Sequence, residues 1–187
     1  MPLYEFEGKR PFIDPTAWIA PSADIIGDVV VGPKCYVGWR AVLRGDHGRI
    51  LVEEGSAVEE GVIIHTSAGF TSRIGPMATL GHGSIFHSAT IEEYAVIGIA
   101  ATVCNFATVG RWAIIAEAGL VKAKQEVPPE TIAAGQPVAV LCGIRAEHRE
   151  RWLRAKQAYI DFTFRNRQGL KRISTDLPSN LRSGDAI

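Results

Sequence analysis

Residues 91–121, IEEYAVIGIAATVCNFATVGRWAIIAEAGLV, decide the fold of this chain, because a large apolar residue returns there at every sixth position. The same step extends back toward the N-terminus through two short interruptions and one five-residue step. Self-similarity at a fixed period is the signature of a repeat architecture. The repeat positions are Ile13, Ile19, Ile25, Val31, Val37, Leu43, Val52, Val58, Ile64, Ile74, Leu80, Phe86, Ile91, Ile97, Val103, Val109, Ile115 and Val121.

The residues around each repeat position indicate a short strand followed by a corner. The side chain two positions earlier is often small, as at Ala95 and Ala101, and glycine often follows directly, as at Gly98 and Gly110. Residues two apart in a strand point to the same side, and glycine lets the backbone turn. Three such units form an 18-residue coil, and stacked coils align their apolar residues in one column. An amphipathic helix is excluded, because apolar residues do not recur at spacings of three and four.

Length and composition fit one globular domain with an appendage. The chain has 187 residues, of which 47% are hydrophobic and 21% charged, so it can build a core. No apolar run reaches the roughly 18 residues of a membrane span, and the N-terminus has no signal-peptide stretch. A formal net charge of zero argues against a nucleic-acid binder. Three scattered cysteines without a CxxC pair fit a reducing cytoplasm.

The C-terminal quarter of the chain differs in charge and pattern from the repeat. Residues 1–144 are predicted to form the repeat domain with an N-terminal cap, and the charge of this segment is acidic. Residues 145–173 carry nine basic and three acidic residues, with apolar Trp152, Tyr159 and Phe162 among them. This pattern predicts a C-terminal α-helix that packs on the prism, either through charge or as a site for an anionic partner. Residues 174–187 are predicted to be a flexible tail.

The repeat register places two of the five histidines together. We call the side of the prism that ends at Ile64 side A, the next, ending at Ile74, side B, and the one ending at Leu80 side C. His65 and His87 both follow directly on a side A, and their spacing of 22 residues equals one coil plus a four-residue loop. They are therefore expected at the same corner on adjacent coils, about 4.8 Å apart. The same ladder continues to Arg44 below and Cys104 above.

The third histidine of this region, His82, follows side C and so belongs to a different corner. Corners are expected on the order of 15 Å apart, whereas zinc binds histidine nitrogens at about 2.0–2.1 Å. A metal shared by His65, His82 and His87 therefore requires His82 of a neighbouring subunit, and a closed threefold ring supplies it three times. Three histidines leave a position open for water, as in catalytic zinc sites. The alternative is a set of polar corner residues at a trimer interface without metal.

Three motifs give this register a family context. LRGD at 43–46, IIHT at 63–66 and GHGSIFH at 81–87 resemble the γ-class carbonic anhydrase family. The family includes relatives from carnitine and phenylacetate metabolism and proteins labelled ferripyochelin-binding. The resemblance covers nearly the whole chain. It implies an all-β fold, a left-handed parallel β-helix of hexapeptide repeats with a C-terminal α-helix.

The resemblance also implies a site and an assembly. It implies a homotrimer with zinc, or alternatively iron(II) or cobalt, bound at each interface by His65 and His87 of one subunit and His82 of the next. Arg44 and Asp46 match a structural ion pair at the interface. Tyr159 matches an aromatic hydroxyl that reaches the metal site from the C-terminal helix; the alternative is that Tyr159 only packs the helix on the prism. No organic cofactor site is predicted.

One stretch departs from the family pattern. Active members carry a sequence resembling N-[IV]-Q-D before the first metal histidine, whereas this chain has Ala57 and Glu59 at the Asn and Gln positions. Glu59 is a candidate base near the metal, or else a solvated residue in an acidic turn. His47 is a candidate proton relay, or a surface histidine. Cys104 is interpreted as a packed thiol rather than a ligand.

The resemblance favours a zinc-dependent lyase, in which metal-bound hydroxide attacks carbon dioxide and gives bicarbonate. Ala57 and Glu59 put the efficiency of that reaction in doubt. Three alternatives remain: an acyl-CoA thioesterase at the same metal site, a non-catalytic trimeric scaffold, and a hexapeptide acyltransferase. Apart from its own copies, the expected partner is a small-molecule substrate, with no nucleic acid and no membrane.

Overall fold

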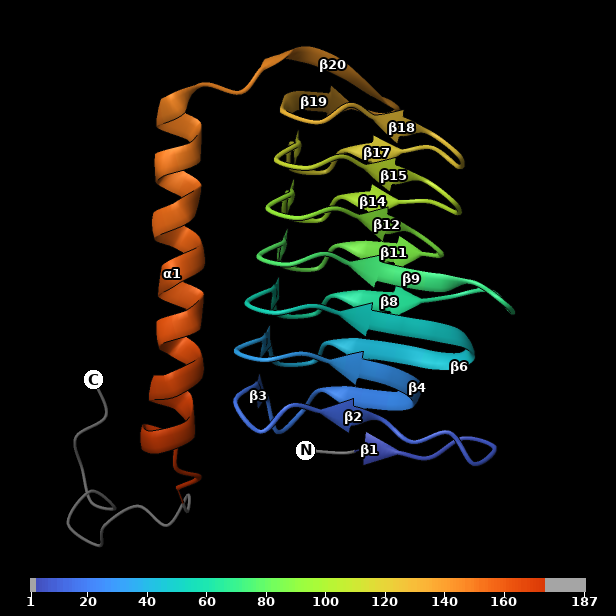
Figure 1. Cartoon of the computed structure of the whole chain (residues 1–187), viewed down its shortest axis with the longest axis vertical. Coiled ribbons are helices and arrows are strands. Elements are labelled where there is room, and N and C mark those ends of the chain that lie inside the picture. The colour runs from blue at the N-terminus through green and yellow to red at the C-terminus, as the bar shows by residue number, and fades with distance from the viewer. Residues whose placement is uncertain (1–2, 174–187) are drawn as a thin grey trace, which may run out of the picture.

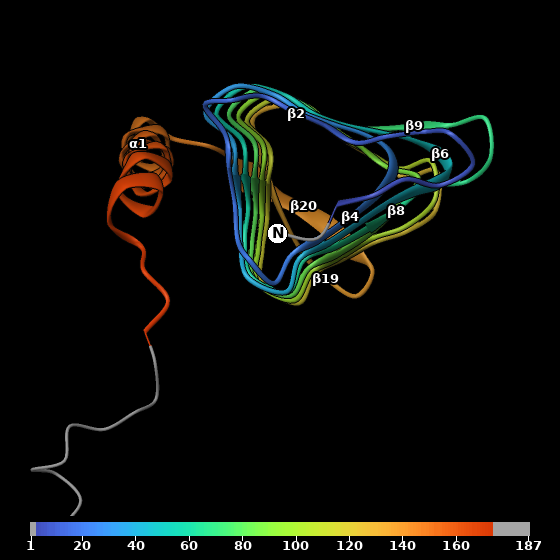
Figure 2. The same cartoon turned by 90° about the horizontal axis from the view of Figure 1, so that it is seen from below.

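The computed structural model describes residues 3–173 of the chain. The predicted flexible tail, residues 174–187, lies outside the described residues. Within them, short parallel strands wind into a three-sided prism, and one long helix stands beside it (Figure 1). Seen along the stack, the coils superimpose as a triangle, and the helix lies outside the triangle (Figure 2). The prediction of a hexapeptide-repeat, left-handed parallel β-helix with a C-terminal helix is confirmed.

The strands form two sheets that together make the three sides. A 12-stranded sheet covers sides A and B, and an 8-stranded sheet covers side C. Side C comprises β3 (Trp18–Ile19), β5 (Tyr36–Val37), β7 (Ala57–Val58), β10 (Thr79–Leu80), β13 (Val96–Ile97), β16 (Ile114–Ile115), β19 (Thr131–Gly135) and β20 (Val138–Gly143). Sides A and B comprise β1 (Leu3–Tyr4), β2 (Phe12–Ile13), β4 (Asp24–Val31), β6 (Val42–Val52), β8 (Ile63–His65), β9 (Thr71–Ile74), β11 (Ile85–His87), β12 (Thr90–Ile91), β14 (Thr102–Val103), β15 (Thr108–Val109), β17 (Leu120–Val121) and β18 (Glu126–Val127).

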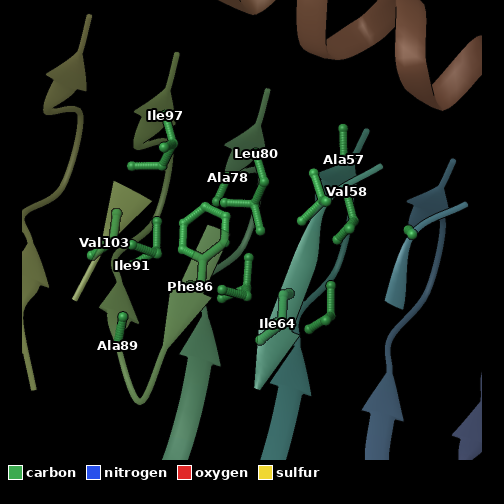
Figure 3. Close-up of a cluster of buried hydrophobic side chains, with 14 of the residues drawn as sticks. Ala57, Val58, Ile64, Ala78, Leu80, Phe86, Ala89, Ile91, Ile97 and Val103 are labelled. Carbon is green, nitrogen blue, oxygen red and sulfur yellow. The ribbon is translucent and has the colours of Figure 1, made fainter. Parts of the chain in front are cut away.

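The strand register follows the repeat that the sequence indicated. On side A, Ile64 pairs with Phe86, Phe86 with Val103, and Val103 with Val121. These side chains point inward and form the column of the core (Figure 3). Seventeen of the eighteen repeat positions are buried, and Ile13 in β2 is partly buried. Burying an aliphatic side chain contributes about 1.5–3 kcal/mol, so this column is the main source of stability.

The corner between sides A and B explains the glycine of the LRGD motif. Strands β4 and β6 both run through this corner instead of stopping at it. A Cβ atom added to Gly45 would lie 2.5 Å from the carbonyl oxygen of Asp28, which no real side chain tolerates. Gly27 has a positive φ of 74° and approaches the Gly45 backbone equally closely. Gly45 therefore lets the two strands bend together, and it places Arg44 and Asp46 on either side of the bend.

The top of the prism ends in a hairpin that leads to the helix. Strand β20 pairs antiparallel with β19, whereas the strands that pair within the coils below it are parallel. Helix α1 (Ala146–Gly169) then runs back along side C (Figure 1). Arg149 stacks over Trp112 at 4.9 Å from the ring centre. No helix in the described part of the chain is both long enough and apolar enough to cross a membrane.

The contact between α1 and side C is only partly the apolar one that the sequence suggested. Tyr159 packs against the core cluster. Phe162 and Leu170, however, remain 43% and 45% exposed. The fully buried helix side chains are polar: Lys156 at 1% exposure and Thr163 at 0%. Helix α1 thus covers outward residues of side C with both apolar and polar side chains, and the amine of Lys156 is buried between the helix and the prism.

Candidate metal centre

His65 and His87 lie one above the other at the corner between sides A and B. Their backbones pair directly in β8 and β11. Their ring centres are 5.0 Å apart in an edge-to-face arrangement. The residue below them on the ladder is Arg44, which pairs with His65. Each of these positions is the one expected from counting six-residue steps.

Asp46 holds the first histidine in place. The Arg44 guanidinium donates a hydrogen bond to Asp46 at 2.7 Å, and the other carboxylate oxygen lies 3.1 Å from Nε2 of His65. Burial raises the pKa of Asp46, but the hydrogen bonds from Arg44 and from the backbone of His47 outweigh it and leave the pKa below its ordinary value. Burial, followed by the nearby Arg44, lowers the pKa of His65 and favours the neutral imidazole. Neutral imidazole is the form that binds metals.

His82 sits at the corner between sides C and A, where two carboxylates hold it. Its Nδ1 lies 2.8 Å from an oxygen of Glu60, and its Nε2 lies 3.1 Å from an oxygen of Glu59. The backbone N–H of His82 also donates to Glu59 at 3.1 Å. The His82 side chain remains 47% exposed, whereas that of Glu59 is 8% exposed. The His82 ring is therefore half-exposed, and it rests on one buried carboxylate, Glu59, and one partly buried carboxylate, Glu60.

Two tyrosines and a lysine complete the surroundings of these carboxylates. Tyr36 donates its hydroxyl proton to Glu60 at 2.6 Å, and Tyr159 of α1 hydrogen-bonds Glu59. Burial raises the pKa of Glu59 above its ordinary value, although the hydrogen bond from Tyr159 opposes this. Lys156 donates to the hydroxyl of Thr79 at 2.9 Å. Glu59 is thus a buried carboxylate in a polar network, not a solvated residue of an acidic turn.

The remaining sequence candidates take simpler positions. Ala57 is 2% exposed and lies in side C between Tyr36 and Thr79. The His47 ring lies 5.8 Å from that of His65, and Asp46, His47 and His65 bring ligand atoms within 4.8 Å of one another. His47 itself is exposed. Cys104 is partly buried and follows β14, one coil above His87.

The chemistry of the three histidines fits a metal only if two subunits share it, because His82 lies at a different corner from His65 and His87. Metal-binding histidines usually have their second ring nitrogen held by an oxygen. Here Asp46 lies against Nε2 of His65, and the Ser88 hydroxyl lies 3.4 Å from Nδ1 of His87. Both ring nitrogens of His82 face carboxylates, Nδ1 that of Glu60 and Nε2 that of Glu59, so a metal at Nε2 would take the place of the Glu59 contact. Among the described residues, the ligand atoms that gather near His65 are those of Asp46 and His47, and neither His82 nor His87 joins that group. One chain therefore offers two incomplete halves at two corners.

A groove separates side C from α1 beside His82. It has a volume of about 450 Å³ and extends from Glu59 and His82 up to Ile132. Its floor is mostly aliphatic, and Trp152 of α1 contributes to its wall. Pairing of β7, β10, β13, β16 and β19 places its ends four coils apart, which is about 19 Å at the usual strand spacing.

Sequence reasoning missed four residues of this network: Tyr36, Glu60, Thr79 and Lys156. Glu60 could have been found from the repeat. Val58 pairs with Leu80 on the next coil, so the residue two positions after Val58, Glu60, lies directly below His82. Lys156 carried none, because the position of a helix residue over a sheet depends on how the helix docks.

Comparisons with known proteins give the family. No model of a known protein family matches the sequence. The chain is 35% identical over 171 residues to the carnitine operon protein CaiE of Proteus sp. (strain LE138), covering 91% of this chain and 86% of that protein. The structure matches that of a Bacillus cereus protein described as a "putative acetyltransferase" with a TM-score of 0.85 and 30% identity, over 86% of this chain and 94% of that one.

A second solved structure supports the same conclusion. It is a hexapeptide transferase family protein from Anaplasma phagocytophilum, with a TM-score of 0.84 and 30% identity, over 90% of this chain and 98% of that one. The similarity to the carnitine relatives extends over the prism and most of the helix region. The chain therefore belongs to the family of the carnitine operon protein CaiE, whose members are hexapeptide-repeat, left-handed β-helix proteins.

Proposed function

We propose that the chain is the subunit of a trimeric, metal-dependent enzyme that adds water to an electrophilic carbonyl carbon. His65 and His87 of one subunit and His82 of the next would bind one zinc, or iron(II) or cobalt in its place. The observation that carries the proposal is the division of the donors: two histidines with ring centres 5.0 Å apart at one corner, and a third, half-exposed histidine at another. Carbon dioxide is the proposed substrate, with an acyl thioester as the alternative.

A divalent metal bound there would make water a strong nucleophile at neutral pH. The residues of this chain would do the rest. Glu59 lies 3.1 Å from Nε2 of His82 and would accept the proton that the water gives up. Burial raises the pKa of Glu59, which strengthens it as a base. Tyr159 would hold this carboxylate in position, and Arg44 would hold Asp46 against His65.

A second candidate is acyl transfer from a coenzyme A thioester, without a metal. The descriptions of two solved relatives at 30% identity as an acetyltransferase and a hexapeptide transferase favour it. In that reaction one histidine would act as a general base, and the other two would have no common role. The metal site gives all three histidines a role, because His65 and His87 share one corner and His82 occupies the corner that a neighbouring subunit would bring to them. This favours the metal site over acyl transfer.

Metal content, measured together with mass in solution, separates these functions. About one zinc or iron per chain in a trimer supports the metal site. Loss of the metal in both His65→Ala and His82→Ala would show that both corners supply ligands. Carbon dioxide hydration by stopped flow is then compared with hydrolysis of acetyl-CoA and with acetyl transfer to amines. A trimer that stays metal-free after anaerobic reconstitution with zinc and iron overturns the proposal. Metal without turnover of any of these substrates leaves the trimeric scaffold.

A further inference from the structure

Side A connects the two halves of the proposed metal site. The segment from His82 to His87 runs along side A, so His82 stands at its first corner and His87 at its second. In a ring that joins the first corner of one subunit to the second corner of the next, side A faces the threefold axis. Its outward residues Ile63 and Ile85 pair on adjacent strands and are 41% and 44% exposed. In that ring the two neighbouring isoleucines would be covered by the other subunits.

The rise of the coil fixes the height at which two subunits meet. One coil rises by the strand spacing of about 4.8 Å, so one side rises by about 1.6 Å. His82 precedes His87 by one side and therefore lies between His65 and His87 in height. If all prisms in the ring point the same way, one shared metal at this height sets the register of the whole interface.

The register can be extended upward from the strand pairing. Leu80 pairs with Ile97 and Ile97 with Ile115, which puts Ile99 and then Glu117 above His82. On the other corner, the pairing of Phe86, Val103 and Val121 puts Cys104 and then Lys122 above His87. Across the interface, Ile99 of one subunit therefore lies at nearly the same height as Cys104 of the next. Glu117 likewise lies at nearly the same height as Lys122, and each difference is about a third of a coil.

We propose that the corner of one subunit that carries Cys104 and Lys122 seats in the groove of the next, with Lys122 paired to Glu117 and Cys104 against Ile99. This interface rests on the proposed function, because the shared metal fixes its height. Ile99 and Glu117 both line the groove between side C and α1. Glu117 and Lys122 are exposed, and neither forms an ion pair with any residue from 3 to 173. The occupant of the groove is therefore a second copy of this chain.

Charge reversal tests the pairing of Glu117 with Lys122. Glu117→Lys and Lys122→Glu should each raise the concentration at which the trimer dissociates severalfold, because three like-charge contacts replace three pairs. The double variant should return it to within twofold of the parent. Lys9→Glu, a reversal near the base of the prism, is the matched control. Two single variants without effect, or a double variant no better than either, would overturn the pairing.

A disulfide tests the height directly. Ile99→Cys should form a covalent link to Cys104 of the next subunit under mild oxidation, giving dimers and trimers on a non-reducing gel. Adding Cys104→Ser should abolish the link, and Phe12→Cys, at another exposed apolar position, should form none. A metal-loaded trimer that neither crosslinks nor responds to charge reversal refutes this register but not the proposed function. A crosslinked trimer that binds no metal refutes the proposed function and leaves the interface.

Discussion

Replacing Lys156 by methionine should stabilise the protein near neutral pH. The Lys156 side chain is 1% exposed, and its amine has Thr79 as a hydrogen-bond partner. Burial lowers the pKa of this amine from its ordinary value to about 7, and the attraction of Glu59 opposes the shift only in part. Methionine has a similar length and no charge to bury.

The magnitude follows from the difference in pKa between the two states. An exposed lysine has a pKa of about 10.4, so the folded value is lower by roughly 3.5 units, and each unit corresponds to about 1.4 kcal/mol. Between pH 7 and pH 10 the unfolded chain binds more protons than the folded one, so the free energy of unfolding rises with pH across that window. At pH 7, where the folded amine is half charged, burying Lys156 costs about 4 kcal/mol. Losing the partner of Thr79 costs about 1 kcal/mol, so Lys156→Met should gain about 3 kcal/mol.

The assay is urea unfolding of both proteins at pH 7 and pH 10, at one fixed subunit concentration because the oligomer contributes to stability. The advantage of Lys156→Met should vanish near pH 10. There the folded amine is neutral and the unfolded one is still mostly charged, so burying Lys156 costs only about 1 kcal/mol, which the loss of the partner of Thr79 cancels. Lys124→Met, at an exposed turn, should change nothing at either pH. If Lys156→Met instead destabilises the protein at pH 7, the amine is charged and paired with Glu59, and the reasoning from burial is wrong.

Three further predictions concern the site and the core. The variant His82→Ala and the double variant His65→Ala/His87→Ala should each bind no metal alone. When equal amounts are unfolded and refolded together, about one quarter of the interfaces should join an intact His65/His87 corner to an intact His82 and bind metal. Metal analysis of the mixed trimer checks this, and no recovery would mean that one chain supplies all ligands. Glu59→Gln should lower kcat by about 10²–10⁴-fold with unchanged metal content, and Tyr159→Phe by about tenfold or less, whereas equal losses would mean that the tyrosine does more than position the carboxylate. Phe86→Ala, at a side chain 1% exposed in the central column, should cost about 3–5 kcal/mol in urea unfolding; Phe12→Ala, at 58% exposure, should cost little, and equal costs would refute the column as the main source of stability.

The repeat allowed the coil register to be predicted to single residues. A hexad leaves no freedom in which residues stack, so the pairing of His65 with His87 and of Arg44 with His65 followed from counting. The same counting separated His82 from the other two. The local conformation of Gly45 and its neighbours was not needed for this, because the loops at 44–49 and 67–72 add whole residues to the count without changing which strands pair.

What the repeat could not predict lies between the helix and the prism. From the sequence, Glu59 could be either a base near the metal or a solvated residue. Only the position of α1 over side C shows that Glu59 is buried beneath Tyr159 and near Lys156. Helix docking depends on packing over a broad surface, which has no six-residue period. Phe162, one of the apolar residues expected to mediate it, in fact stays 43% exposed.

The hairpin at the top of the prism has a consequence for how far the coils can stack. Coils of parallel strands could in principle stack without limit, because each one presents an open edge to the next. Here β17 and β18 leave parallel edges on sides A and B, whereas β20 runs antiparallel on side C. A second prism arriving end to end could match the strand direction on two sides only by mismatching it on the third. One reversed strand thus ends the regular repeat, because a further parallel coil could not continue the pattern on all three sides.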